Sequence, residues 1–281
     1  MADWNPDFYK TGYEGFERAE NFPTAEAVAD YRRLLLDKTR HEVEFIGRQT
    51  GGRPARVFEV ACGNGRLLMG LAKAGLLAYG FGLDIAQKRI EFANRWASDA
   101  GVTQVRQVVA DALTLPDQEP GTFDLAVCIT GAFQYFHPIC ETAPDELLAR
   151  MRRALKPNGY ILLELYELSH ARLTMFGLSN GRLRTWQPLP PEDRFAYYLN
   201  DWEYYADRQT LRDRKIFIGR DGLIDAGREH VVKYYQEEEL TALLTRAGFT
   251  DVELFGDFER GAHQPGHSAV CVALGRVAAG R

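Results

Sequence analysis

The chain has 281 residues, of which 46% are hydrophobic, and this is enough to bury a full core. It carries 34 Lys and Arg against 39 Asp and Glu. This mildly acidic balance argues against a protein that mainly grips a nucleic-acid backbone, although a local basic patch would escape such a count.

Targeting and redox signals are few. The N-terminal stretch MADWNPDFYKTGYEGF has neither a cationic start nor an apolar run, and no window is long and apolar enough to span a bilayer. The four cysteines, Cys62, Cys128, Cys140 and Cys271, are scattered without a CxxC pair. We therefore expect a reduced, cytoplasmic protein with no structural disulfide, no zinc site and no membrane partner.

Short apolar runs alternate with helical patterns in the first part of the chain. Residues 24–52 repeat apolar positions at helical spacing and end in Gly-Gly, a helix stop. The runs ARVFEVA, AYGFGLD, QVRQVVAD, TFDLAVCIT and YILLELYE follow, with helical segments between most of them. This alternation indicates βαβ units and a parallel sheet that is covered on both faces.

The alternation breaks after Glu167. Residues 171–235 are rich in aromatic residues and alternating patterns, such as FAYYLNDWEYY and REHVVKYY, with turn signals between the later runs. They predict a small antiparallel meander inserted into the α/β domain. A helix, EEELTALLTRAG, and two strands, DVELFGD and SAVCVALGRV, close the chain. The loop between these strands has no helical pattern, so they should pair antiparallel.

The stretch VFEVACGNGRLLMGLAKAG, residues 57–75, joins a strand to a helix through a glycine-rich turn. Gly63 and Gly65 would let a ligand approach the backbone, where the helix start offers free N–H groups. Leu68 replaces the third glycine of a dinucleotide fingerprint, and the ending of a P-loop is absent. Glu59 would repel a pyrophosphate, so the turn suits a ligand that brings positive charge.

Further features fall at the ends of the neighbouring strands. Asp84 ends GFGLD, where a carboxylate can accept both hydroxyls of a ribose. Asp111 and Ala112 end the third strand, and ITGAFQYF follows the fourth. Open α/β sheets bind ligands at this edge. Taken singly, the glycines are also consistent with ordinary turns, and either aspartate with a helix N-cap.

Five stretches, in this order, resemble the successive motifs of class I S-adenosylmethionine-dependent methyltransferases: EVACGNGR, GLD, ADALTLP, FDLAVCITGAFQY and ALKPNGYILLE. The resemblance covers about residues 56–167 and 236–277. It implies a Rossmann-like three-layer sandwich, in which a seven-stranded, mostly parallel sheet has its last strand antiparallel. We divide the chain accordingly into an N-terminal helical segment (1–52), a cofactor-binding core (53–167 and 236–281) and an inserted antiparallel β lid (168–235).

The same resemblance implies S-adenosylmethionine as cofactor and assigns residues to it. Those assigned to the cofactor are Glu59, Ala61, Gly63 and Gly65 for its amino-acid part, Asp84 with Ile85 beside it for the ribose, Asp111 and Ala112 for the adenine, and Thr130 at the mouth of the crevice. One departure is Cys62, at a position where glycine or a small polar residue is common.

Methyl transfer from a sulfonium mainly requires positioning and the exclusion of water, whereas a hydroxyl acceptor also gains from a general base. His137 and Tyr135, after the fourth strand, and Tyr166, at the end of the fifth, are the candidate catalytic residues. His137 is the best single base, and the tyrosines equally suit pocket walls. His263 and His267 in HQPGH are poor evidence for a metal pair, since a Pro-Gly loop separates them.

The lid-like insertion and the absence of a basic groove favour methyl transfer to an oxygen or nitrogen of a small-molecule acceptor rather than to a nucleic acid. Two alternatives stay open: a methyltransferase acting on RNA or protein, and a non-catalytic module that only binds the cofactor. The sequence ITGAFQY stands where an Asn/Asp-Pro-Pro-Tyr/Phe motif would have supported methylation of nucleic acid. The acceptor, the use of a base and the oligomeric state, a homodimer included, are not determined by the sequence.

Overall fold

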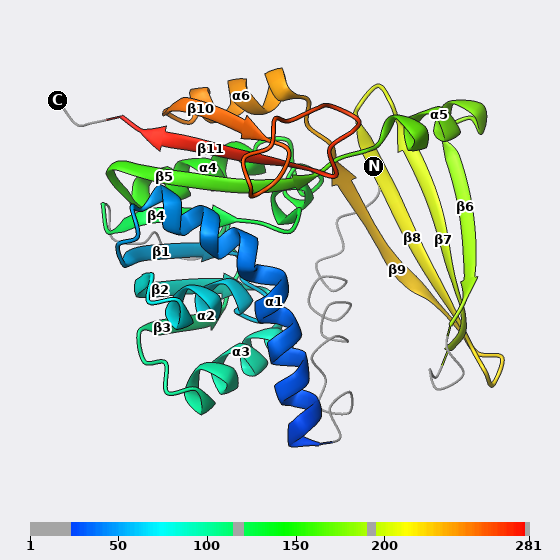
Figure 1. The fold of residues 1–281 in the computed structure, drawn as a ribbon. Helices are drawn as coiled ribbons and strands as arrows, with labels where there is room; N and C mark the ends of the chain where they lie inside the picture. Colours follow the sequence, from blue (N-terminus) through cyan, green and yellow to red (C-terminus); the bar gives the residue numbers. More distant parts are fainter. Residues whose placement is uncertain (1–23, 115–120, 190–194, 279–281) are drawn as a thin grey trace.

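The computed structural model describes residues 24–114, 121–189 and 195–278 (Figure 1). The first 23 residues of the predicted N-terminal segment therefore lie outside the described part of the chain. Within it, the long helix α1 (Ala25–Gln49) begins at Thr24, whose hydroxyl accepts a hydrogen bond from the Ala27 N–H at 3.1 Å. This is the N-cap that a threonine before an amphipathic helix predicts.

The core sheet has seven strands in the order β10-β11-β5-β4-β1-β2-β3. Their bounds are β1 (Ala55–Val60), β2 (Leu77–Asp84), β3 (Val105–Val109), β4 (Phe123–Cys128), β5 (Leu155–Tyr166), β10 (Phe249–Phe255) and β11 (Val270–Val277). Neighbours from β3 to β5 pair in parallel, whereas β11 is antiparallel to both β5 and β10. The predicted seven-stranded sheet with an antiparallel last strand is therefore confirmed.

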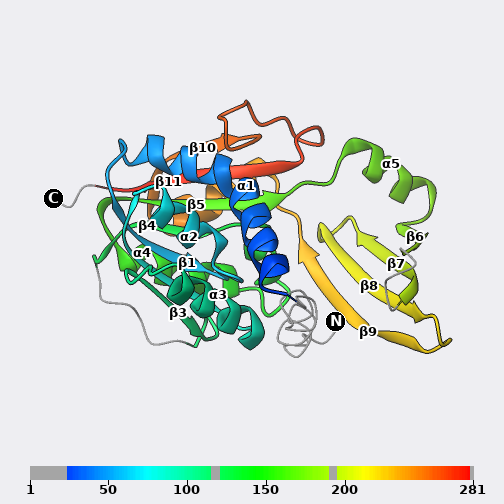
Figure 2. The same cartoon turned by 60° about the horizontal axis from the view of Figure 1, so that its bottom comes forward.

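Helices cover both faces of this sheet (Figures 1 and 2). Their bounds are α2 (Arg66–Lys73), α3 (Gln87–Asp99), α4 (Ala143–Ala154) and α6 (Glu237–Arg246). On one face, Phe45 of α1 and Leu68 of α2 pack against Val57 and Val127. On the other face, apolar residues of α4 and α6 pack against the sheet. The strands read as continuous apolar runs because both of their faces are buried.

A second, antiparallel sheet has the strand order β6-β7-β8-β9 and confirms the predicted meander. Its strands are β6 (Arg182–Pro188), β7 (Phe195–Tyr205), β8 (Thr210–Gly219) and β9 (Ile224–Lys233). The helix before it, α5 (His170–Leu178), was not predicted. Phe176 of α5 packs against Tyr204 with ring centroids 5.4 Å apart. So short a helix is defined by this tertiary contact more than by its own periodicity.

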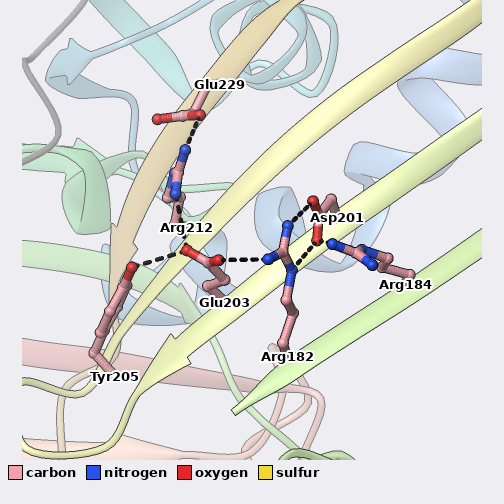
Figure 3. Close-up of polar contacts among 7 residues, drawn as sticks. All are labelled: Arg182, Arg184, Asp201, Glu203, Tyr205, Arg212 and Glu229. Carbon is pink, nitrogen blue, oxygen red and sulfur yellow. Dashed lines mark hydrogen bonds and ion pairs between the residues drawn. The ribbon is translucent and has the colours of Figure 1, made fainter. Parts of the chain in front are cut away.

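One face of the second sheet carries a network of cross-strand ion pairs (Figure 3). Arg212 donates to Glu203 and to Glu229, each at 2.8 Å, and Asp201 accepts from Arg182 and Arg184. Along β7 they alternate with Trp202 and Tyr204, which the pleat of the strand directs to the opposite face. Such ion pairs each contribute roughly 0.2–1 kcal/mol to the stability of the sheet.

Among the described residues, no helix has the length and apolar character that crossing a membrane requires.

Candidate functional site

A cavity of about 600 Å³ opens where the parallel strands β1, β2 and β4 end. Ten of the residues predicted for the site line it together: Glu59, Ala61, Gly63, Asp84, Ile85, Asp111, Ala112, Thr130, Tyr135 and Tyr166. Gly65 and His137 are not among its lining residues. The carboxyl ends of parallel strands meet at one edge of the sheet, and this topology gathers residues that are far apart in sequence.

Glu59 lies on β1 and is almost completely buried, with 2% of its surface exposed. Its Oε2 atom has no hydrogen-bond partner within the described part of the chain. Burial raises the pKa of its carboxyl to about 8, and the positive charge of Arg66 partly opposes this rise. A buried carboxylate with an unsatisfied oxygen is suited to a ligand that carries a positive charge.

Asp84 ends β2 and holds the backbone around the cavity. Its Oδ2 accepts from the Gly63 N–H, and its Oδ1 accepts from the Ala86 N–H, both at 2.8 Å. Each oxygen of a carboxylate can accept a second hydrogen bond. Asp84 therefore fixes the glycine-rich turn by accepting backbone N–H groups, as the side chain of an N-cap residue does. Its carboxylate also lines the cavity.

The two glycines of the turn have different roles. Gly63 (φ +55°) lines the cavity, and a Cβ there would lie 2.7 Å from the guanidinium of Arg89. Gly65 (φ +76°) is the N-cap of α2, and a Cβ there would overlap the side-chain amide of Gln107. Both positions need the left-handed backbone that glycine adopts without strain. Gly65 therefore serves close packing rather than the lining of the cavity.

Arg66, at the start of α2, is a lining residue that the sequence analysis missed. Its Nη1 donates to Glu42 at 2.6 Å and to Thr39 at 2.8 Å, and its Nη2 donates to Thr130 at 3.2 Å. Helix α1 thus reaches the cavity, where it also contributes Tyr31, Leu35 and Lys38. The sequence did contain an indication of this role. A basic residue in the first turn of a helix interacts unfavourably with the helix dipole, so its presence there indicates another interaction.

Two lining residues other than glycine have a left-handed backbone, Ala61 (φ +56°) and Thr130 (φ +61°). The Thr130 N–H donates to Glu164 of β5 at 2.6 Å, and this bond holds the strained turn after β4. Strained backbone of this kind persists only where surrounding contacts fix it, and it is concentrated at binding sites.

Gln134 joins the far wall of the cavity to both sheets. It lies in the 3-10 helix η4 (Ala132–Tyr135) and is fully buried. Its amide donates to the carbonyls of Tyr166 (3.1 Å) and Lys233 (3.0 Å) and accepts from the Tyr166 N–H (2.7 Å). The next residue, Tyr135, lines the cavity and contacts His230 of β9, with ring centroids 5.4 Å apart.

The structure gives no geometric support to His137 as the general base. The residue is partly buried outside the cavity lining, where burial and then Lys233 lower the pKa of its imidazole. Tyr135, the last residue of η4, lines the cavity, whereas His137, two residues further along, does not. Sequence spacing alone does not determine side-chain direction in such a short helical turn.

A family model described as a methyltransferase domain matches residues 57–159, which span β1 to the first part of β5. This part of the chain is a methyltransferase domain. The match confirms the methyltransferase family predicted from the sequence motifs, and the described sheet has the strand order and directions that the family implies.

Similar proteins cover the methyltransferase domain and, in part, the rest of the chain. A ubiquinone biosynthesis O-methyltransferase of Methylococcus capsulatus is 32% identical over 44% of this chain and 51% of its own length. A malonyl-[acyl-carrier protein] O-methyltransferase of Geobacter sulfurreducens is 28% identical over 82% of this chain and 68% of its own length. The chain thus spans about half the length of the first of these relatives.

The solved structure of the CcbJ methyltransferase from Streptomyces caelestis superposes on this chain with a TM-score of 0.68. It covers 86% of this chain and 90% of its own, at 21% sequence identity. The superposed part of the chain is much longer than residues 57–159, so this solved structure shares the fold of most of the chain.

Proposed function

We propose that the chain transfers the methyl group of S-adenosylmethionine to an oxygen or nitrogen of a small-molecule acceptor. The observation that carries this proposal is the buried Glu59 carboxyl, whose Oε2 has no partner within the described residues and which lines a cavity next to a glycine-rich turn. S-adenosylmethionine brings a positively charged amino group and a sulfonium, and burial makes an electrostatic match of this kind strong.

The residues present fit this cofactor. Glu59 would hold the amino group, Arg66 the carboxylate of the amino-acid part, and Asp84 the ribose. Ile85, Asp111 and Ala112 line the cavity beyond Asp84, where the adenine would lie. When bound, the cofactor supplies a methyl group on a sulfonium that leaves as a neutral thioether, so the protein needs to position two reactants and keep water away.

The acceptor would approach from the side of Tyr135 and Tyr166. Both tyrosines line the cavity, and Tyr135 contacts the second sheet through His230. The second sheet would therefore act as a lid over the acceptor. The aromatic walls suit a small molecule. The names of the similar proteins include two O-methyltransferases, which supports an oxygen acceptor.

Calorimetric titration tests the proposal at its first step. The wild-type chain is titrated with S-adenosylmethionine and with its demethylated product, S-adenosylhomocysteine, beside Glu59→Gln and the matched control Glu44→Gln, which is exposed on α1. Wild type and control should bind both compounds, and Glu59→Gln should bind S-adenosylmethionine at least about tenfold more weakly. Failure of the wild type to bind either compound would refute the proposal.

Methylation of amine and phenol panels then tests the reaction itself. Transfer to at least one small molecule is the expected result. Cofactor binding without transfer to any amine or phenol, but with transfer to RNA or protein, would favour the macromolecular alternative. Cofactor binding with no transfer to any of these would favour the non-catalytic one.

A further inference from the structure

We propose that Glu167, His263 and Cys271 form a binding site for a divalent zinc-like cation at the junction between the two sheets. One carboxylate oxygen, one imidazole nitrogen and one thiol sulfur of these residues lie within 4.8 Å of one another. They come from the end of β5, the loop between β10 and β11, and β11 itself, segments that Figure 1 shows side by side. The proposal does not depend on methyl transfer.

The chemical nature of the three groups selects the cation. Zinc binds nitrogen, thiolate sulfur and carboxylate oxygen, whereas calcium and magnesium prefer oxygen alone. The sequence predicted no zinc site because its cysteines lack paired spacing, but here the ligands come from distant segments, with Glu167 and His263 separated by 96 residues. A spacing rule for local motifs does not detect a site of this kind.

The separation between Glu167 and His263 is one that two ligands of a single zinc ion can have. His263 Nε2 lies 3.2 Å from Glu167 Oε1, and the imidazole side chain is only 3% exposed. Without an ion, this contact is a long hydrogen bond. With metal–ligand distances of about 2.0–2.1 Å, a separation of this size subtends roughly 100° at the ion, close to the tetrahedral angle.

The other nitrogen of His263 is held as metal-ligating histidines usually are. Nδ1 contacts the carboxylate of Glu237, the first residue of α6. A carboxylate on the far nitrogen fixes the ring orientation and the tautomer, and it leaves Nε2 to bind the ion. Glu237 is therefore proposed as the positioning residue of the site, not as a ligand.

Cys271 would be the third ligand of the ion after a small movement of its sulfur. Its side chain is buried, with 3% of the residue exposed. The carboxylates of Glu167 and Glu237 both act electrostatically on this thiol. A divalent cation would offset both carboxylates, and the thiol would lose its proton to solvent on binding. The sulfur would need to approach the nitrogen by at most about 1.3 Å, since tetrahedral S and N ligands of zinc lie about 3.5 Å apart.

The site has access to solvent and a definite place in the fold. A second cavity, of about 360 Å³, is lined by Glu167, Glu237 and His263, and it would supply the remaining coordination position with water. Glu167 directly follows β5, where the chain leaves the core sheet, and Glu237 begins α6, where the chain returns to it. A bound ion would thus fasten both connections between the core and the second sheet.

Zinc titration of the full chain, freed of metal by a chelator under reducing conditions, tests the proposal. We expect one Zn²⁺ per chain with a dissociation constant of roughly 1 µM or lower. His263→Gln and Cys271→Ala should each weaken binding at least about tenfold, and Glu237→Gln by roughly 10–100-fold. The controls are Cys140→Ala, an exposed free cysteine, and His267→Gln, whose ring packs against His170; both should bind as the wild type does.

A second measurement keeps the test independent of folding defects. Co²⁺ added to the wild type should produce a thiolate-to-cobalt charge-transfer band that Cys271→Ala lacks, while circular dichroism shows that this variant is folded. Absence of stoichiometric zinc binding, binding that is unchanged in both His263→Gln and Cys271→Ala, or binding that only His267→Gln removes would each overturn the proposal. Failure of cofactor binding would bear only on the proposed methyl transfer.

Discussion

The carboxylate of Asp84 accepts the N–H of Gly63 at 2.8 Å, so the end of β2 sets the shape of the turn that follows β1. The second oxygen accepts the N–H of Ala86 at the start of the next connection. One side chain thus fixes two neighbouring strand ends before any ligand is present. The proposed ribose contact would use the lone pairs that remain.

Replacement of Asp84 should therefore affect both stability and binding. Asp84→Ala leaves two buried N–H groups without an acceptor, and we expect a loss of about 1–3 kcal/mol in the free energy of unfolding. Affinity for S-adenosylhomocysteine should fall at least about tenfold. Urea unfolding and calorimetry measure the two effects. Asp111→Ala is the control for stability, because Asp111 is exposed and its Oδ1 accepts the local N–H of Leu113. Unchanged affinity in Asp84→Ala would contradict the ribose assignment.

Glu59 should make the ligand-free chain less stable at high pH. Its pKa in the folded state, about 8, lies above the ordinary value of 4.5. A group of this kind stabilises the fold fully below pH 4.5 and loses that contribution as the pH rises through 8. Glu59→Gln removes the penalty, so we expect it to exceed the wild type by about 1–2 kcal/mol at pH 9. Thermal unfolding across pH 5–9 measures this, and a variant less stable than the wild type at pH 9 would contradict it.

A comparison of Gly65 with Gly75 separates the cost of side-chain crowding from the cost of backbone strain. Both have positive φ, +76° and +70°, but an added Cβ would meet Gln107 at Gly65 and nothing within 4 Å at Gly75. Gly75→Ala should cost only the backbone strain, about 1–2 kcal/mol. Gly65→Ala should cost about 1–3 kcal/mol more, since the buried Gln107 must move. Chemical denaturation compares the two, and equal costs would show that the packing adds nothing.

Gln134 should couple the cavity wall to the second sheet. Gln134→Leu removes two donated hydrogen bonds and one accepted one, from partly buried backbone groups of Tyr166 and a buried carbonyl of Lys233. We expect a loss of about 1–3 kcal/mol in the free energy of unfolding, with faster hydrogen exchange in β9. Gln134→Glu still accepts from Tyr166 but sets its second oxygen against two carbonyls in a buried site, so it should lose as much or more. Normal exchange in β9 of Gln134→Leu would show that the second sheet is held by other contacts.

Much of this site could be predicted because parallel strands impose a rule. Glu59 lies on β1, Asp84 ends β2 and Asp111 follows the end of β3, and the topology brings the carboxyl ends of such strands to one edge whatever their separation in sequence. The local structure of residues 57–75 could also be predicted directly. An apolar run, two glycines and an amphipathic run permit few alternatives to a strand, a turn and a helix.

The contacts between distant segments were decided by the tertiary structure alone. Arg66 donates hydrogen bonds to Glu42 and Thr39 of α1, a helix that the sequence predicts only to be amphipathic. His137 is not among the lining residues of the cavity, although Tyr135 and Phe136 just before it are. The ring of His263 bridges Glu167 and Glu237 across the two connections to the second sheet. Periodicity determines which face of an element is buried, but it carries no information about which other segment packs there. The packing of distant segments against one another is what created these contacts.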